Sequence, residues 1–114
     1  MPTDKLSFRT ESRAAETVVF LAGELDLEVA SRMRAAMEPL LPLADRRLTL
    51  NLRELKYIDS TGIGILIGIV KARHARGAAF GVEEVPAHIL KLFDITGMTS
   101  FLTAAATAEG TERK

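Results

Sequence analysis

The residues of this sequence that are best suited to chemistry stand together in the stretch YIDSTGIGILIGIV, residues 57–70. Two hydroxyl side chains, Ser60 and Thr61, follow Asp59 and precede glycines at positions 62, 64 and 68. Hydroxyl groups beside glycines occur in nucleophile elbows, in turns that bind phosphate and at the starts of helices. Each of these possibilities makes different demands on the rest of the chain.

A nucleophilic serine requires a general base, usually a histidine, within hydrogen-bond reach. If a helix follows Ser60, His74 lies roughly 20 Å away along the helix axis, and no pattern places His88 near Ser60. The G-x-S-x-G motif also fails, because Ile58 occupies its first glycine position. We therefore expect no serine hydrolase. Two histidines 14 residues apart, without a paired carboxylate motif, also predict no metal site.

A dinucleotide site is a second possibility, because a strand, the glycines, a helix and then Glu83 and Glu84 follow one another. An acid about 20 residues beyond the glycines is what a ribose site requires. Two features oppose this site. Gly68 comes one residue late for G-x-G-x-x-G, and nine residues, 53–61, separate the expected strand from Gly62. No Gly-Lys-Ser or Gly-Lys-Thr is present for a Walker loop, and a small nucleotide-binding enzyme stays a remote alternative.

The composition is that of a globular chain of about one domain, and we treat residues 1–114 as a single domain. The chain is 47% hydrophobic and 26% charged, and its 15 basic and 15 acidic residues balance. This balance gives no field that would draw the chain to nucleic acid or to an anionic membrane. We interpret the basic segments 46–53 and 71–76 as solvated positions beside buried ones. Without cysteine, a signal peptide or an apolar run of the roughly 20 residues that span a bilayer, a cytoplasmic location is expected.

The spacing of apolar residues predicts the elements that position Ser60. Alternation in residues 6–10 and a β-branched run in residues 17–23 predict the two strands of a hairpin. Residues 24–41 change to a helical period, with Asp26 as the expected N-cap and Pro42 as the stop. Residues 48–52 alternate again and predict a third strand.

Residues 57–70 and the basic residues after them predict a helix over residues 61–76. Glycines are poor strand interiors, and basic residues followed by Gly77 suit a helix end. Ser60 or Thr61 is the expected N-cap. We expect this helix to be buried on most faces through Val70 and exposed beyond it.

The remaining residues predict a strand at 78–85, a helix at 86–97 and a last short strand at 100–105, with a frayed tail at 103–114. The resulting order, β-β-α-β-α-β-α, predicts parallel pairing with right-handed crossovers that place helices against the sheet. The fold class is therefore α/β.

The start of the second helix is where Ser60 would act. The first backbone N–H groups of a helix have no partner within it, and Gly62 and Gly64 carry no side chains to cover them. Such a site tolerates an added phosphate. The alternative is a purely structural start, in which Ser60 caps the helix and the glycines allow close packing. The residues alone leave both interpretations open.

Two motifs carry a resemblance to a known family: Gly-Glu-Leu-Asp at residues 23–26 and Asp-Ser-Thr-Gly-Ile-Gly at residues 59–64. Together with PAHILKLFDITGM at residues 86–98, they closely resemble the STAS domain of bacterial anti-sigma factor antagonists over about residues 6–102. Beyond this core, the weakly patterned tail departs from the family, many members of which continue into another helix. The resemblance implies a small mixed sheet of four or five strands with helices packed mainly on one face.

The resemblance also implies a function. Ser60 would be phosphorylated by a cognate anti-sigma factor that is also a GHKL-type serine kinase, and a PP2C-type phosphatase would reverse the modification. The unphosphorylated protein would bind the kinase and release a sigma factor, without catalysing a reaction and without a cofactor. Thr61 is a second candidate acceptor. The expected partner-binding residues are Asp26, Asp59, Ser60, Thr61, Gly62 and Gly64.

Within the resemblance, we expect a monomer or weak dimer that binds no nucleic acid directly and no membrane. A rival interpretation is a STAS module that scaffolds or regulates a larger signalling or lipid-transport complex. The intact Asp-Ser-Thr-Gly motif favours the phosphorylation-controlled switch over this rival.

Overall fold

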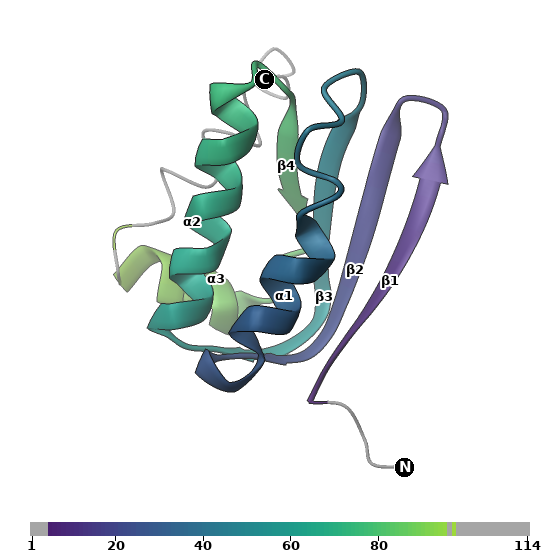
Figure 1. Cartoon of the computed structure of the whole chain (residues 1–114). Coiled ribbons are helices and arrows are strands. Elements are labelled where there is room, and N and C mark those ends of the chain that lie inside the picture. The colour runs from purple at the N-terminus through teal and green to yellow at the C-terminus, as the bar shows by residue number, and fades with distance from the viewer. Residues whose placement is uncertain (1–4, 96, 98–114) are drawn as a thin grey trace.

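A computed structural model describes residues 5–95 and 97 of the chain. These residues form four strands and three α-helices, and Figure 1 shows how the helices are arranged around the sheet. The predicted last strand at 100–105 and the tail at 103–114 lie outside the described residues. The elements in chain order are β1 (Leu6–Arg13), β2 (Glu16–Leu25), a 3-10 turn η1 (Leu27–Val29), α1 (Ala30–Met37), β3 (Arg47–Ile58), α2 (Ser60–Ala75), β4 (Phe80–Glu83) and α3 (Ala87–Ile95).

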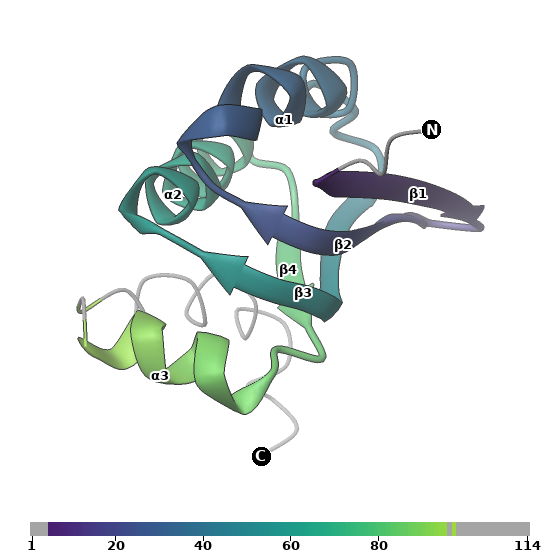
Figure 2. The ribbon, with the colours of Figure 1, turned by 90° about the horizontal axis from the view of Figure 1, so that it is seen from below.

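The four strands form one mixed sheet in the order β1-β2-β3-β4. β1 and β2 pair antiparallel as the predicted hairpin, whereas β2 with β3 and β3 with β4 pair parallel. Figure 2 shows α1 and α2 on one side of β3 and α3 on the other, so two of the three described helices share a face. The predicted mixed α/β fold is thereby confirmed.

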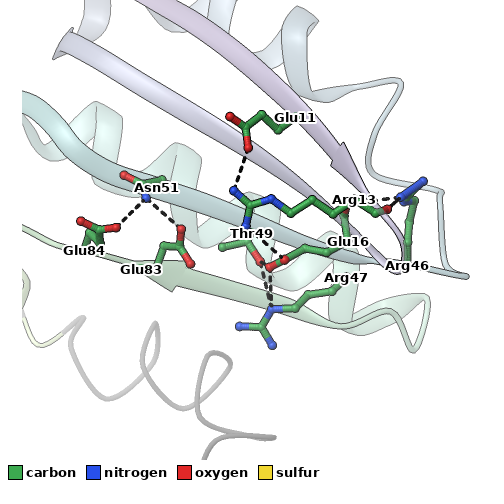
Figure 3. Close-up of polar contacts among 9 residues, drawn as sticks. All are labelled: Glu11, Arg13, Glu16, Arg46, Arg47, Thr49, Asn51, Glu83 and Glu84. Atoms are coloured by element: carbon green, nitrogen blue, oxygen red, sulfur yellow. Dashed lines mark hydrogen bonds and ion pairs between the residues drawn. The ribbon is translucent and has the colours of Figure 1, made fainter.

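The two faces of β3 differ in chemistry, because successive side chains of a strand point in opposite directions. Leu48, Leu50 and Leu52 belong to the hydrophobic core with the apolar sides of the helices. Thr49 and Asn51 between them are buried polar residues on the other face. Figure 3 shows how they are satisfied by hydrogen bonds to glutamates of neighbouring strands.

β3 is longer than the predicted strand at 48–52 and reaches Ile58. Beyond Leu52 the buried residues recur at Leu55 and Ile58, every third position. In this part the pairing between β2 and β3 shifts register, and such bulges keep strands paired while turning their side chains. The prediction of strict alternation therefore ended the strand too early. β4, at Phe80–Glu83, is shorter than the predicted strand at 78–85.

The first predicted helix is also shorter than residues 24–41. Asp26 is an N-cap as predicted, but it caps the 3-10 turn η1, and α1 follows and ends at Met37. The regular helical hydrogen bonding stops at Pro39, because proline lacks the N–H that would bond to the carbonyl of Ala35. The prediction that Pro42 ends the helix is therefore wrong by about one turn.

α2 confirms the predicted helix at 61–76 almost residue for residue, and Gly77 follows it with a φ of +66° as a C′ glycine. The prediction that the helix is exposed beyond Val70 is wrong at Arg73, whose side chain is fully buried. Its guanidinium donates hydrogen bonds to five backbone carbonyls, those of Leu40, Leu41, Leu43, Arg46 and Ala79. The basic segment 71–76 therefore contains a core residue that joins two loops to α2.

Candidate functional site at the start of helix α2

Asp59, and not Ser60 or Thr61, is the N-cap of α2. Its Oδ1 accepts a hydrogen bond from the backbone N–H of Gly62 at 2.9 Å, and its carbonyl accepts from Ile63 at 2.9 Å. Because the acid caps the helix, the sequence prediction of a hydroxyl cap is wrong. Ser60 becomes the first helical residue, and its side chain is exposed.

Asp59 also joins the two sequence motifs in space. Its Oδ2 accepts from the backbone N–H of Leu27 at 3.3 Å, and its own N–H donates to the carbonyl of Leu25 at 3.3 Å. The end of β2, which carries the Gly-Glu-Leu-Asp motif, is therefore tied to the start of α2. This arrangement follows from the parallel pairing of β2 with β3, because both strands end at the same edge of the sheet.

Asp26 lies at this edge in a paired state. Its Oδ1 accepts from the N–H of Glu28 at 3.1 Å, and its Oδ2 lies 2.8 Å from Nζ of Lys5. The hydrogen bond from Lys5 holds the pKa of Asp26 below its ordinary value, and the bonds to Asp26 and Glu28 raise the pKa of Lys5. Sequence reasoning missed Lys5, which precedes the first strand and belongs to no motif.

The two glycines of the motif play different parts. Gly62 is buried, and a Cβ atom there would lie 2.5 Å from the carbonyl oxygen of Leu25 and 2.6 Å from Cγ1 of Ile58. Gly62 is therefore required for the close approach of α2 to β2. Gly64 is exposed, and a Cβ atom there would meet no heavy atom within 4 Å. Only Gly62 supports the structural interpretation of close packing.

The chain matches the model of a known family, described as "Mlab, STAS domain", over residues 8–108. The chain belongs to the STAS domain family. Among its relatives, the anti-sigma-B factor antagonist of Bacillus subtilis is 35% identical over 94 residues, which cover 81% of this chain and 84% of that protein. The anti-sigma-B factor antagonist of Staphylococcus aureus is 29% identical over 107 residues, covering 94% of this chain and 96% of that protein.

Solved structures confirm the STAS fold. The unphosphorylated form of the anti-sigma factor antagonist SpoIIAA superposes with a TM-score of 0.69 at 22% identity, covering 82% of this chain and 83% of that one. An anti-sigma factor antagonist from Mycobacterium paratuberculosis gives a TM-score of 0.75 at 21% identity, covering 90% and 92% of the two chains. At these identities the likeness concerns the fold alone.

The other chemistries considered for the serine find little support in this STAS domain. His74 is exposed near the far end of α2, and Nε2 of His88 lies 2.8 Å from the carbonyl oxygen of Lys56. Neither histidine is hydrogen-bonded to Ser60. Within the described residues, no helix is long and apolar enough to cross a membrane.

The turn between β3 and α2 is as tight as a dinucleotide site requires, because only Asp59 separates the two elements. The expected nine-residue gap before Gly62 is therefore wrong. However, the Gly62 N–H, which a phosphate would need, already donates to Asp59. Figure 3 shows that the carboxylates of Glu83 and Glu84 accept from Nδ2 of Asn51, at 2.8 and 3.3 Å. The acids expected for a ribose are thus engaged within the sheet.

Proposed function

We propose that this STAS domain is an anti-sigma factor antagonist whose partner binding is controlled by phosphorylation of Ser60. The observation that carries the proposal is the placement of Ser60. It is exposed at the first position of α2, while the capping of that helix is left to Asp59. The names of the Bacillus subtilis and Staphylococcus aureus relatives, both anti-sigma-B factor antagonists, support the partner class.

In the proposed cycle, the unphosphorylated domain binds an anti-sigma factor that is also a GHKL-type serine kinase, and the sigma factor is released. The kinase transfers the γ-phosphoryl group of ATP to the Ser60 hydroxyl, whose proton leaves, and ADP is the second product. A PP2C-type phosphatase hydrolyses the phosphoserine and restores the binding form. The domain is a substrate in both steps and supplies no catalytic group, and the cycle takes place in the cytoplasm.

Two opposing energies set the direction of the switch. A phosphate at the N-terminus of α2 gains about 0.3–1 kcal/mol from the helix dipole, so the fold survives the modification. Burying the same dianion in an interface without a counter-charge costs several kcal/mol. A net loss of roughly 3–4 kcal/mol would weaken binding several-hundred-fold, since about 1.4 kcal/mol is tenfold.

The charges at the site favour this outcome. Asp59 is adjacent to Ser60, so its carboxylate adds repulsion to any phosphate on Ser60. That carboxylate already accepts two backbone N–H groups, which are therefore not free for the phosphate. Asp26 contributes less, because Lys5 lies 2.8 Å from its carboxylate and offsets its charge. We therefore assign the electrostatic part of the switch to Asp59 and the shaping of the adjacent surface to Asp26. Thr61, which is only partly exposed, stays the second candidate acceptor.

The test is to incubate the purified chain with ATP and each GHKL-type serine kinase of the source bacterium, and to locate added phosphate by mass spectrometry. We expect one phosphate, on Ser60. Ser60→Ala should bind the same kinase and accept no phosphate, whereas Ser60→Asp should bind at least tenfold more weakly. Tight binding of Ser60→Asp, or phosphate on no residue with every kinase, would refute the proposal.

A second candidate function follows from the description of the matching family model, which names Mlab and not an antagonist. In this alternative the STAS domain is a permanent subunit of a larger signalling or lipid-transport complex. Affinity purification from the source bacterium separates the two functions. A complex of constant composition that is indifferent to Ser60→Asp favours the subunit, whereas capture of one kinase that is lost in Ser60→Asp favours the switch.

A further inference from the structure

We infer that a groove between α1 and α2, close to Ser60, receives an amphipathic helix of the anti-sigma factor; this inference rests on the proposed function. The groove has a volume of about 650 Å³, within the range of cavities that hold ligands and large side chains. Its walls include apolar side chains from both helices and the segment after α1, namely Met37, Leu41, Ile65 and Ile69. These helices lie beside each other on one face of the sheet (Figure 2).

Gly64 and Gly68 line the α2 side of the groove. A Cβ atom at either position would meet no heavy atom of the described residues within 4 Å, and neither residue has a positive φ. No packing contact and no backbone conformation therefore requires glycine at these two positions. Glycine is also the least favourable residue of a helix interior after proline. The two glycines keep the surface of α2 open where the fold itself gains nothing from the opening.

The groove continues the surface that carries Ser60. Ser60, Gly64 and Gly68 recur every four residues and so lie along one side of α2. Gly68 is about 12 Å from Ser60 along the helix axis. A stable interface covers about 800 Å² of each partner, which corresponds to a disc of about 16 Å radius. A kinase whose footprint is centred on Ser60 would therefore cover the groove as well.

Side chains around the groove indicate the chemistry of the occupant. Leu27, with 72% of its surface exposed, lies one turn before Ser31, which lines the groove. Arg34 also lines the groove, is exposed, and forms no ion pair with another described residue. The partner helix would place an apolar side chain in the groove and would contact the exposed Leu27. A carboxylate one turn away on the same partner helix would pair with Arg34. Glu38, the C-cap of α1, lies one turn beyond Arg34 and favours a basic residue at the other end of the partner helix.

The test measures the Kd for the kinase that phosphorylates Ser60, with a non-hydrolysable ATP analogue so that the serine stays unmodified. Gly68→Leu fills the groove and should raise the Kd at least tenfold. Arg34→Glu, a change on an exposed side chain, should raise it at least threefold. Ala75→Leu is the matched control, because it adds the same side chain at an exposed position of α2 beyond the groove, and should leave the Kd unchanged. Thermal unfolding of each variant verifies the fold.

The outcomes separate the groove from the switch. A wild-type chain that no kinase binds or phosphorylates would refute the proposed function and this inference together. A wild-type chain that is bound and phosphorylated, with the same Kd for Gly68→Leu and Arg34→Glu, would overturn the groove alone. If Gly68→Leu unfolds at a lower temperature than the wild type, Arg34→Glu decides the matter. Loss of self-association in Gly68→Leu, with kinase binding unchanged, would assign the groove to a second copy of this chain and overturn the inference.

Discussion

Arg73 offers the sharpest test of what holds the site in place, because a single buried side chain joins two loops to α2. Nη1 donates to the carbonyls of Leu40, Leu41 and Leu43 at 3.0–3.3 Å, and Nη2 donates to that of Ala79 at 2.8 Å and to that of Arg46. Nη1 carries two hydrogens for three acceptors, so one hydrogen is shared. The guanidinium thus makes about four effective hydrogen bonds. Burial lowers the pKa of Arg73, with Arg76 a smaller cause.

Arg73→Leu keeps much of the volume and removes every donor. Hydrogen bonds to a charged group contribute about 1.5–3 kcal/mol each, and a buried acceptor left unsatisfied costs about 1–3 kcal/mol. Part of this loss is offset, because the leucine variant no longer has to desolvate a charged guanidinium. We therefore expect a net loss of about 3–5 kcal/mol in the free energy of unfolding, a large part of the 5–15 kcal/mol typical of a domain. Arg73→Lys, which keeps the charge but has three donors, should lose about half as much.

The assay is urea unfolding at pH 7, followed by circular dichroism. Arg76→Leu is the control, because Arg76 is exposed and lies in the same basic segment; its stability should stay within about 0.5 kcal/mol of the wild type. If the free energy of unfolding of Arg73→Leu also lay within about 1 kcal/mol of the wild-type value, the five carbonyls would find other partners at little cost. The reasoning about Arg73 would then be wrong.

Three further predictions concern the site itself. Gly62→Ala should lower the free energy of unfolding by about 2 kcal/mol, because its Cβ would meet Leu25 and Ile58. Gly64→Ala should raise the free energy of unfolding by up to about 1 kcal/mol. Thermal unfolding of the two variants measures the difference. Asp59→Ala should lose about 1–2 kcal/mol of the free energy of unfolding with the helix cap. Asp59→Asn should lose less, because its oxygen can still accept from Gly62 although its amide nitrogen cannot accept from Leu27. Equal losses in chemical denaturation would contradict the capping role. The lowered pKa of Asp26 stabilises the fold above its ordinary value of 3.8, and this contribution is lost as the pH falls through the lowered value. Asp26→Asn should therefore be less stable than the wild type at pH 7, and this difference should shrink as the pH falls below 3.8. A difference in stability that does not change with pH in acid would contradict the pairing.

Much of the fold follows from local patterns in the sequence. The hairpin strands, the parallel third strand and α2 each have a strong period or a clear end signal, such as Gly77. The structure brings the two motifs together, because the ends of the parallel strands β2 and β3 meet at one edge of the sheet. What the pattern identifies well is therefore the type of each element and its apolar side.

What the sequence did not predict depends on contacts between distant residues. Lys5 pairs with Asp26 across the start of the hairpin, and nothing in its own neighbourhood marks it. Arg73 looks like a solvated basic residue until the loop from residue 40 to residue 46 places its carbonyls around it. Strand β3 passes its predicted end because a register shift, a property of two strands, replaces the simple alternation of one.

The most informative of these differences is the identity of the cap of α2. If Ser60 capped the helix, its hydroxyl would accept a backbone hydrogen bond, and a phosphate on it would disturb the first turn. Asp59 performs that role instead, through its bond to Gly62 and its second bond to Leu27. The Ser60 side chain is therefore not needed for the fold, and a modification there can change binding while the helix start and the end of β2 stay joined. This separation of fold from switch is what the proposed function requires, and Asp59→Asn tests it. That variant should keep an oxygen for the Gly62 N–H, lose the bond to the Leu27 N–H and reduce the repulsion on a phosphorylated Ser60.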